Sequence, residues 1–182
     1  MSDPATLPEL RRNVYHFDAL IPVGSRTTCD LPGKSGSFQH SWLDTDVPEY
    51  MTEERNLRSG NLEPRLNRQQ HLDALGVFQS LKRRAAKGQL PIGTTPDSPA
   101  KVMQSLSYLI ELRPKLSMGA RPPRLFRLYY AEPANVQDAL LPLVLSTKPN
   151  GPDLQQEQNA SIDDAKARSR VWELTKAMKG KK

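Results

Sequence analysis

Three apolar runs between residues 107 and 148 constrain the fold most, because each has the length and composition of a β-strand. They cover residues 107–114, 124–132 and 139–148, and turn-forming residues separate them. Strands joined by short loops predict an antiparallel meander. Pro142 interrupts the third run and has no backbone N–H, so we expect an edge position or a bulge there.

Helical patterns lie on both sides of these runs. Over residues 67–87, Leu and Phe recur at three- and four-residue spacing, which predicts a helix with Asn67 as its N-cap. A second helix is predicted over residues 161–179, with Ser161 as its N-cap and acidic residues in its first turn. Weaker patterns predict a strand over residues 14–23, a short helix after Pro48, and a short helix or turn over residues 100–106.

The order of these elements predicts an α+β fold, in which a small antiparallel sheet packs with helices over residues 67–182. Residues 1–66 are weakly patterned, and we expect them to form a partly irregular N-terminal extension. The chain has 182 residues, of which 16 are proline, so one modest core with much loop is the expected organisation.

Charge is distributed unevenly along the chain. Residues 1–60 contain six basic and nine acidic residues, whereas residues 61–130 contain twelve basic and four acidic residues. A basic excess concentrated in one region favours a polyanionic partner such as nucleic acid, although a solvated basic surface explains the same count.

Other residue types narrow the class of protein. The single cysteine, Cys29, permits no intramolecular disulfide, and the first residues lack the apolar run of a secretion signal. No apolar stretch is long enough to span a membrane. His16, His40 and His71 lie far apart without ligand spacing. We therefore expect a cytoplasmic protein that binds no membrane, metal or cofactor.

Basic residues with interleaved tyrosines are concentrated in the strand region. They are Arg113, Lys115, Arg121, Arg124, Arg127, Tyr129, Tyr130 and Lys148. Arginine and lysine hold phosphates and aromatic rings stack on unpaired bases, so this composition is typical of an RNA or DNA site. The alternative is that the aromatic side chains belong to the core while the arginines form a solvated face of the sheet.

The order of these segments resembles the RelE/HigB toxins of type II toxin–antitoxin systems, notably their phage-derived branch. The resemblance covers roughly residues 67–179. It rests on LIELRP at 109–114, RLFRLYY at 124–130, LLPLVLSTKP at 140–149 and DAKAR at 164–168. Where the family usually has a lysine pair, this chain has only Lys148, and His71 is the only histidine in the region of resemblance.

The resemblance implies an endoribonuclease that cleaves mRNA on the ribosome through attack of a ribose 2′-OH on the adjacent phosphate. Such a reaction needs a base, a cation on the phosphate and an acid for the leaving oxygen. Arg113, Arg124 and Arg127 are the candidate phosphate ligands, because the planar guanidinium group stays charged and bonds two oxygens. Tyr129 and Lys148 are the other candidate catalytic residues. As RNA-binding residues we expect Lys115, Arg121, Tyr130 and Arg168.

The resemblance also implies a cognate antitoxin protein that covers the basic site. Two other functions remain open from the sequence. One is an RNA- or protein-binding module that has the same fold but no catalytic activity, which the scarcity of histidine favours. The other, less favoured, is a DNA-binding regulator in which residues 49–87 form a helix-turn-helix.

Overall fold

The computed structural model describes residues 40–61, 66–90, 93, 98–103, 105–114, 117–118, 124–133, 136, 138–149 and 154–179. The strand expected over residues 14–23 lies outside these ranges. The elements follow one another as β1 (Ser41–Trp42), α1 (Pro48–Ser59), α2 (Arg68–Ala86), β2 (Ala100–Met103), β3 (Leu106–Leu112), β4 (Ser117–Met118), β5 (Arg124–Ala131), β6 (Ala139–Pro149) and α3 (Leu154–Lys179).

The predicted α+β class is confirmed, with a mixed and mostly antiparallel sheet. Among the described residues the strand order is β1-β6-β5-β3-β2, and β4 pairs with the outer part of β5. The pairs β2–β3, β3–β5 and β5–β6 are antiparallel, as the meander requires, whereas the short β1 pairs parallel to β6. The prediction that residues 1–66 form an extension apart from the sheet is wrong for residues 41–59, which supply β1 and α1 to the same core as the later elements.

Pro142 lies at a bulge, as the sequence predicts. Tyr129 pairs with Val144 and Tyr130 pairs with Pro142, so Leu143 is an additional residue on β6. The bulge disrupts the regular ladder beside Pro142, which cannot donate a hydrogen bond to the neighbouring strand.

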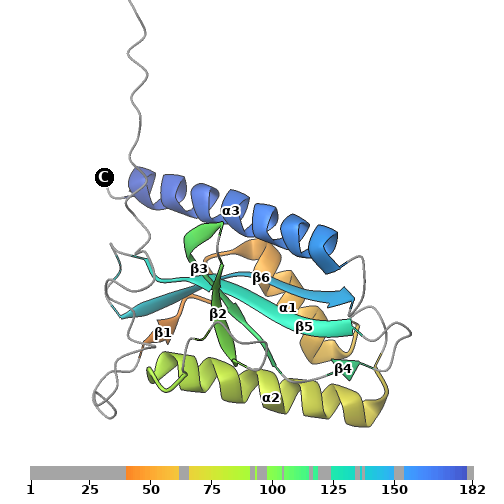
Figure 1. Ribbon diagram of the computed structural model, residues 1–182. Helices are drawn as coiled ribbons and strands as arrows, with labels where there is room; N and C mark the ends of the chain where they lie inside the picture. Colours follow the sequence, from red (N-terminus) through yellow and green to blue (C-terminus); the bar gives the residue numbers. More distant parts are fainter. Residues whose placement is uncertain are drawn as a thin grey trace, which may run out of the picture.

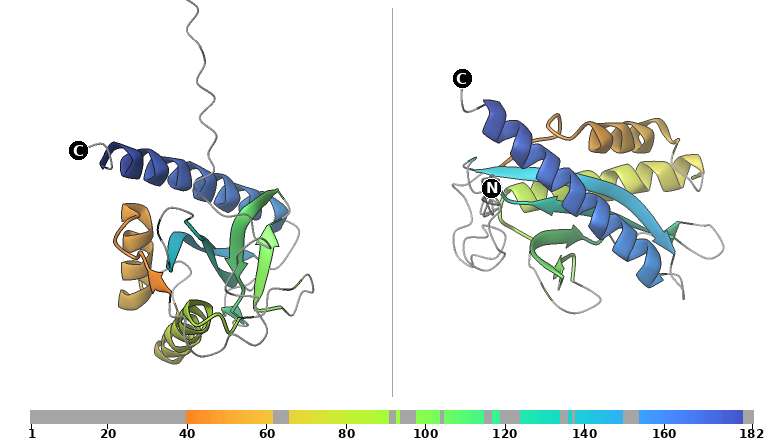
Figure 2. Two further views of the ribbon diagram at one scale, coloured as in Figure 1. Left: turned by 90° about the vertical axis from the view of Figure 1, so that its left-hand side faces the viewer. Right: turned by 90° about the horizontal axis from the view of Figure 1, so that it is seen from above.

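The three helices surround the sheet in different ways (Figures 1 and 2). α3 covers one face and α2 lies against the opposite face, while α1 runs beside β6 (Figure 2). Beyond β1 the edge of β6 is protected by α1, because the backbone N–H of Leu145 donates to Glu53 Oε2 at 2.7 Å. A side chain on that open edge satisfies a backbone group that would otherwise pair with another chain.

The predicted start of α2 is confirmed. Asn67 and Gln70 form a capping box, in which each side chain accepts a hydrogen bond from the other residue's backbone N–H. The short helix expected after Pro48 is also confirmed as α1, with Pro48 at its start. α1 buries Tyr50 and Leu57, which lie two turns apart on one face.

Two other predictions were wrong. α3 begins at Leu154 rather than at residue 161, because LQQEQNA contains good helix formers and neither Gly nor Pro. Ser161 is therefore not a cap, and its hydroxyl donates to Glu157 O within the helix at 3.1 Å. Residues 100–103 form strand β2 rather than a helix or turn, because pairing with β3 outweighs their weak local preference.

Candidate functional site

Three cationic side chains from three separate segments converge on one buried carboxylate, that of Glu111 in β3. Lys148 Nζ lies 2.8 Å from Glu111 Oε1, and Arg127 Nε lies 3.0 Å from the same oxygen. Arg113 Nε lies 3.5 Å from Glu111 Oε2. We call Glu111, Arg113, Arg127 and Lys148 the Glu111 cluster.

Strand register explains why these residues meet. Glu111 pairs directly with Tyr129 on β5, and Arg127 points to the same face two residues earlier. Lys148 on β6 pairs with Leu125, which is two residues further along that face. The cluster therefore lies at the end of the sheet where β3 and β6 finish and β5 begins.

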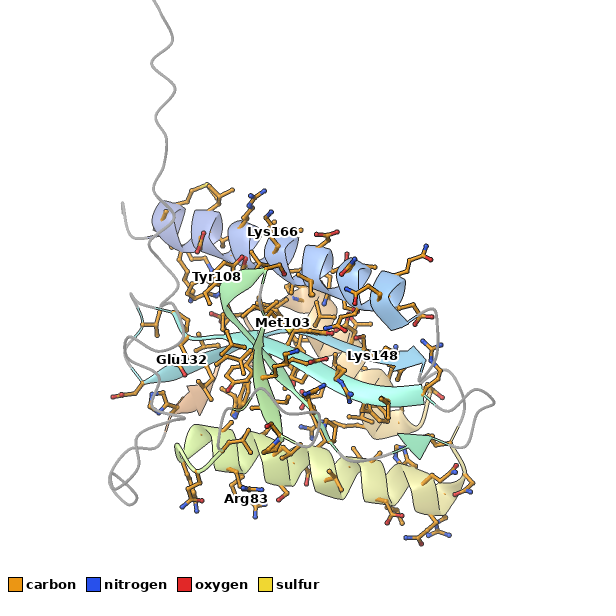
Figure 3. All side chains as sticks on the ribbon, in the orientation of Figure 1. Arg83, Met103, Tyr108, Glu132, Lys148 and Lys166 are labelled. Carbon is orange, nitrogen blue, oxygen red and sulfur yellow. The ribbon has the colours of Figure 1, made fainter. Side chains whose placement is uncertain are left out.

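Neighbouring polar groups fix the orientation of the cluster. Tyr129 Oη donates to Glu111 Oε1 at 3.3 Å. Lys148 Nζ also donates to Gln158 Oε1 of α3 at 3.1 Å, and Figure 3 shows Lys148 on the sheet close to the start of that helix. Arg127 Nη1 donates to the carbonyl of Phe126 at 2.6 Å. The first turns of α3 therefore cover the Lys148 side of the cluster.

The cluster carries more positive than negative charge, since three cations share the Glu111 carboxylate. Burial lowers the pKa of Lys148; Glu111 opposes this shift, while Arg127 and Arg113 add to it. Burial also lowers the pKa of Arg127, against the attraction of Glu111. Burial raises the pKa of Tyr129, as does the charge of Glu111, so the phenol stays protonated near neutral pH.

Accessibility falls from the rim of the cluster to its floor. The side chain of Arg113 is 17% exposed, those of Arg127 and Lys148 are 7% and 5% exposed, and that of Glu111 is fully buried. Arg124, at the start of β5, is 27% exposed and forms an ion pair with Glu157 of α3. Its Nε donates to Thr147 Oγ1 at 3.0 Å. Arg113 and Arg124 are therefore the cations that a ligand would meet first.

The structure thus brings together most of the candidate catalytic residues. Arg113, Arg127, Tyr129 and Lys148 contact one carboxylate, and Arg124 lies near them on β5. The candidate RNA-binding residues Lys115 and Arg121 lie outside the described residues.

Tyr130 and Arg168 lie apart from the cluster. Tyr130 is fully buried on the opposite face of the sheet, where its ring meets that of Trp42 edge to face with centroids 5.3 Å apart. Arg168 Nη2 donates to Glu53 Oε1 at 2.7 Å, and its Nη1 donates to Leu143 O at 2.7 Å. These contacts join α3, α1 and β6.

Glu111 and Gln158 were not among the residues selected from the sequence. A signal for Glu111 was present, because an acidic residue between Ile110 and Leu112 in an apolar strand needs a charged partner when it is buried. Gln158 gave no signal, since the helix that carries it was predicted to begin three residues later.

Within the described part of the chain, no three His, Cys, Asp or Glu side chains are grouped as metal ligands. None of the described helices is long and apolar enough to cross a membrane. Comparisons of the chain with protein-family models, curated proteins and solved structures find no match.

Proposed function

We propose that this chain is a cytoplasmic endoribonuclease that cleaves mRNA without a metal ion, and that the Glu111 cluster is its active site. The observation that carries the proposal is the convergence of Arg113, Arg127 and Lys148 on one carboxylate. The same three residues are phosphate-binding and catalytic candidates on the sequence alone. An excess of buried positive charge at the end of a sheet favours an anionic ligand.

The proposed reaction is a transesterification. The ribose 2′-oxygen attacks phosphorus, the bond from phosphorus to the 5′-oxygen breaks, and the products are a 2′,3′-cyclic phosphate and a 5′-hydroxyl. Arg113 and Arg124 at the rim bind the non-bridging phosphate oxygens, and Arg127 adds positive charge beneath them.

The two proton transfers need groups with opposite properties. Lys148 suits acceptance of the 2′-OH proton, because its lowered pKa increases the neutral fraction of the amine. Tyr129 suits donation to the leaving 5′-oxygen, because its raised pKa keeps the phenol protonated. Both groups lie below the surface, so the substrate has to displace the contact between Lys148 and Gln158.

The ribosome and a cognate antitoxin are proposed partners on the strength of the resemblance to the RelE/HigB toxins. The order of α2, the antiparallel strands β2 to β6 and α3 over residues 68–179 is compatible with that resemblance.

Induced expression in a bacterial host tests the proposal. Wild-type protein should arrest growth and create new mRNA 5′ ends, and Arg127→Ala should abolish both. Arg58→Ala, at an exposed arginine of α1, is the matched control and should behave as wild type. Because Arg127 is buried, the same assay on the partly exposed Arg113→Ala guards against a simple folding defect. Normal growth with abundant, folded wild-type protein would contradict the proposal.

Burial of the cluster favours a second candidate function, namely RNA binding without cleavage. Lys148, Arg127 and Tyr129 are each less than a tenth exposed. Such burial is compatible with catalysis, and equally with a structural role in which these side chains hold Glu111 in place beneath Arg113 and Arg124. Incubating purified protein with RNA, with and without ribosomes, separates the two. Binding without new RNA ends in either condition would favour this second function.

A further inference from the structure

α3 has two apolar faces, only one of which contacts the rest of the protein. The inner face buries Ile162, Ala165, Ser169 and Trp172 on the side of the helix that lies against the sheet. The helix lies on the outside of the molecule in each view of Figures 1 and 2, and Lys166 in Figure 3 points away from the sheet. Its outer face is therefore open over the described part of the protein.

That outer face carries a regular stripe. Its residues are spaced four and three apart in alternation and are Ala160, Asp164, Ala167, Val171, Leu174 and Met178, all of them exposed. Val171, Leu174 and Met178 are 63%, 54% and 67% exposed, which is unusual for large apolar side chains that follow one another on a helix. Alternating four- and three-residue spacing is the pattern by which one helix packs along another.

A hollow continues the stripe on one side. A cavity of about 470 Å³ lies between the start of α1 and the second half of α3. Ala167 and Val171 of the stripe line this cavity, together with Val47 and Pro48 at the start of α1. A helix lying on the stripe would therefore have a depression beside it that can accept side chains.

The charges of α3 are divided between its two halves. Residues 154–165 contain three acidic and no basic residues, whereas residues 166–179 contain five basic residues and one acidic residue. Glu157, Arg168 and Lys176 are already paired with Arg124, Glu53 and Asp46, whereas Asp163 and Asp164 in the first half and Arg170 and Lys179 in the second half are exposed. Two such helices attract each other when they run antiparallel, since the exposed acidic residues of each then lie toward the exposed basic residues of the other and the helix dipoles also oppose. A parallel pair would instead place Asp164 beside its own copy.

We propose that the outer face of α3 binds a second copy of this chain, forming an antiparallel helix pair. In that pair Val171 packs against the small Ala167 of the partner subunit, and the bulky Met178 packs against the partner subunit's Ala160. The seam from Ala160 to Met178 extends about 27 Å at the rise of an α-helix. The complementarity of size and charge within one sequence identifies the occupant as the chain itself.

Sedimentation velocity of the full-length protein over a concentration series tests this proposal. The wild type should form a dimer with a dissociation constant in the micromolar range, as expected for an interface built on one helix pair. Leu174→Glu should weaken the dimer at least about tenfold, because it places a carboxylate in the apolar seam. Val171→Glu should do the same.

Leu72→Glu is the matched control, because Leu72 is a similarly exposed leucine (52%) on α2. Each variant exchanges an exposed side chain, so circular dichroism should match the wild type, and thermal unfolding should match it at concentrations at which all the proteins are monomeric. A wild type that stays monomeric throughout the series overturns the proposal, and so does a dimer that Leu72→Glu weakens as much as Leu174→Glu does.

Disulfide trapping tests the orientation of the pair. In a Cys29→Ser background, mixing the single variants Val171→Cys and Ala167→Cys should give mainly the mixed crosslinked dimer. Crosslinks that form mainly between identical variants would show a parallel pair and contradict the charge argument.

Discussion

Two buried ionic clusters lie on opposite faces of the same sheet, and they are compensated in opposite ways. On the α2 side, Lys82 contacts two carboxylates, with Nζ at 2.6 Å from Asp44 Oδ1 and at 3.6 Å from Glu54 Oε1. On the α3 side, Glu111 contacts three cations. In the first cluster two carboxylates surround one lysine, and in the second three cations surround one carboxylate.

The surroundings of Lys82 complete its compensation. Its Nζ lies 4.8 Å from the ring centroid of Trp42, 5.3 Å from that of Tyr50 and 5.8 Å from that of Phe78, and it donates to Tyr50 Oη at 2.9 Å. Aromatic faces stabilise a cation that is removed from water. Lys82 therefore serves the fold, whereas we propose that the cations of the Glu111 cluster bind an anionic ligand.

Among the substitutions considered, removal of the Glu111 carboxylate should lower the free energy of unfolding most. Glu111→Gln leaves the buried Arg127 and Lys148 and the partly exposed Arg113 without their shared anion. Loss of one partner from a buried ion pair costs about 3–5 kcal/mol. We expect a loss of this size in the free energy of unfolding, measured by chemical denaturation. A loss below about 1 kcal/mol would show that the cations are compensated elsewhere.

Removing Lys82 should cost less. Lys82→Met keeps the aliphatic contact with the three rings, and Asp44, whose side chain is 36% exposed, can turn to water. Glu54 keeps its ion pair with Arg58 at 3.0 Å. We expect a loss of about 1–2 kcal/mol by the same denaturation measurement. A loss equal to that of Glu111→Gln would remove the proposed difference between the clusters.

The pH dependence of stability should reveal the excess charge around Lys148. Its pKa in the folded protein is lowered, so between that value and 10.5 the unfolded chain binds more protons than the folded one. The free energy of unfolding of the wild type, relative to Lys148→Met, should therefore rise as the pH increases across this window. Tyr129 is present in both proteins, so its own titration largely cancels. A relative decrease in stability would mean that the ion pair with Glu111 dominates.

The smallest loss of stability is expected at Arg58, which pairs with one of the two carboxylates that contact Lys82. Arg58 pairs with Glu54 one helical turn away, and its side chain is 61% exposed. Arg58→Ala should cost no more than about 0.5 kcal/mol, because solvent and salt screen such a pair. A larger loss, measured at low and high salt, would show that Glu54 depends on Arg58 to hold Lys82.

The sequence predicted the strands of the meander because their apolar runs are separated by clear turn residues. It predicted α2 because Asn67 and the leucine spacing agree. It could not predict β1, since Ser41 and Trp42 form a strand only by pairing with Ala139 and Leu140, almost a hundred residues later. Such long-range pairing leaves no local pattern.

The cationic residues of the candidate site could be predicted from the sequence, but the carboxylate that they share could not. Arg113, Arg127 and Lys148 were found as basic residues near tyrosines, whereas their common partner Glu111 depends on strand register. Tyr129 and Tyr130 look equivalent in the sequence, yet consecutive strand residues point to opposite faces, so only Tyr129 reaches the cluster. Arg168 looks basic and exposed in a helix, but its contacts depend on where α1 lies.

The central claim is that the rim of the Glu111 cluster binds RNA phosphates, and the salt dependence of RNA binding tests it most directly. We would measure the affinity for a 2′-O-methyl single-stranded oligonucleotide, which cannot be cleaved, over a range of salt concentrations. Arg113→Ala and Arg124→Ala should each reduce the slope of log affinity against log salt by about 0.7, as expected for one lost phosphate contact on a single strand. Arg58→Ala should leave the slope unchanged. Equal slopes for all four proteins, or no binding by the wild type, would contradict the claim.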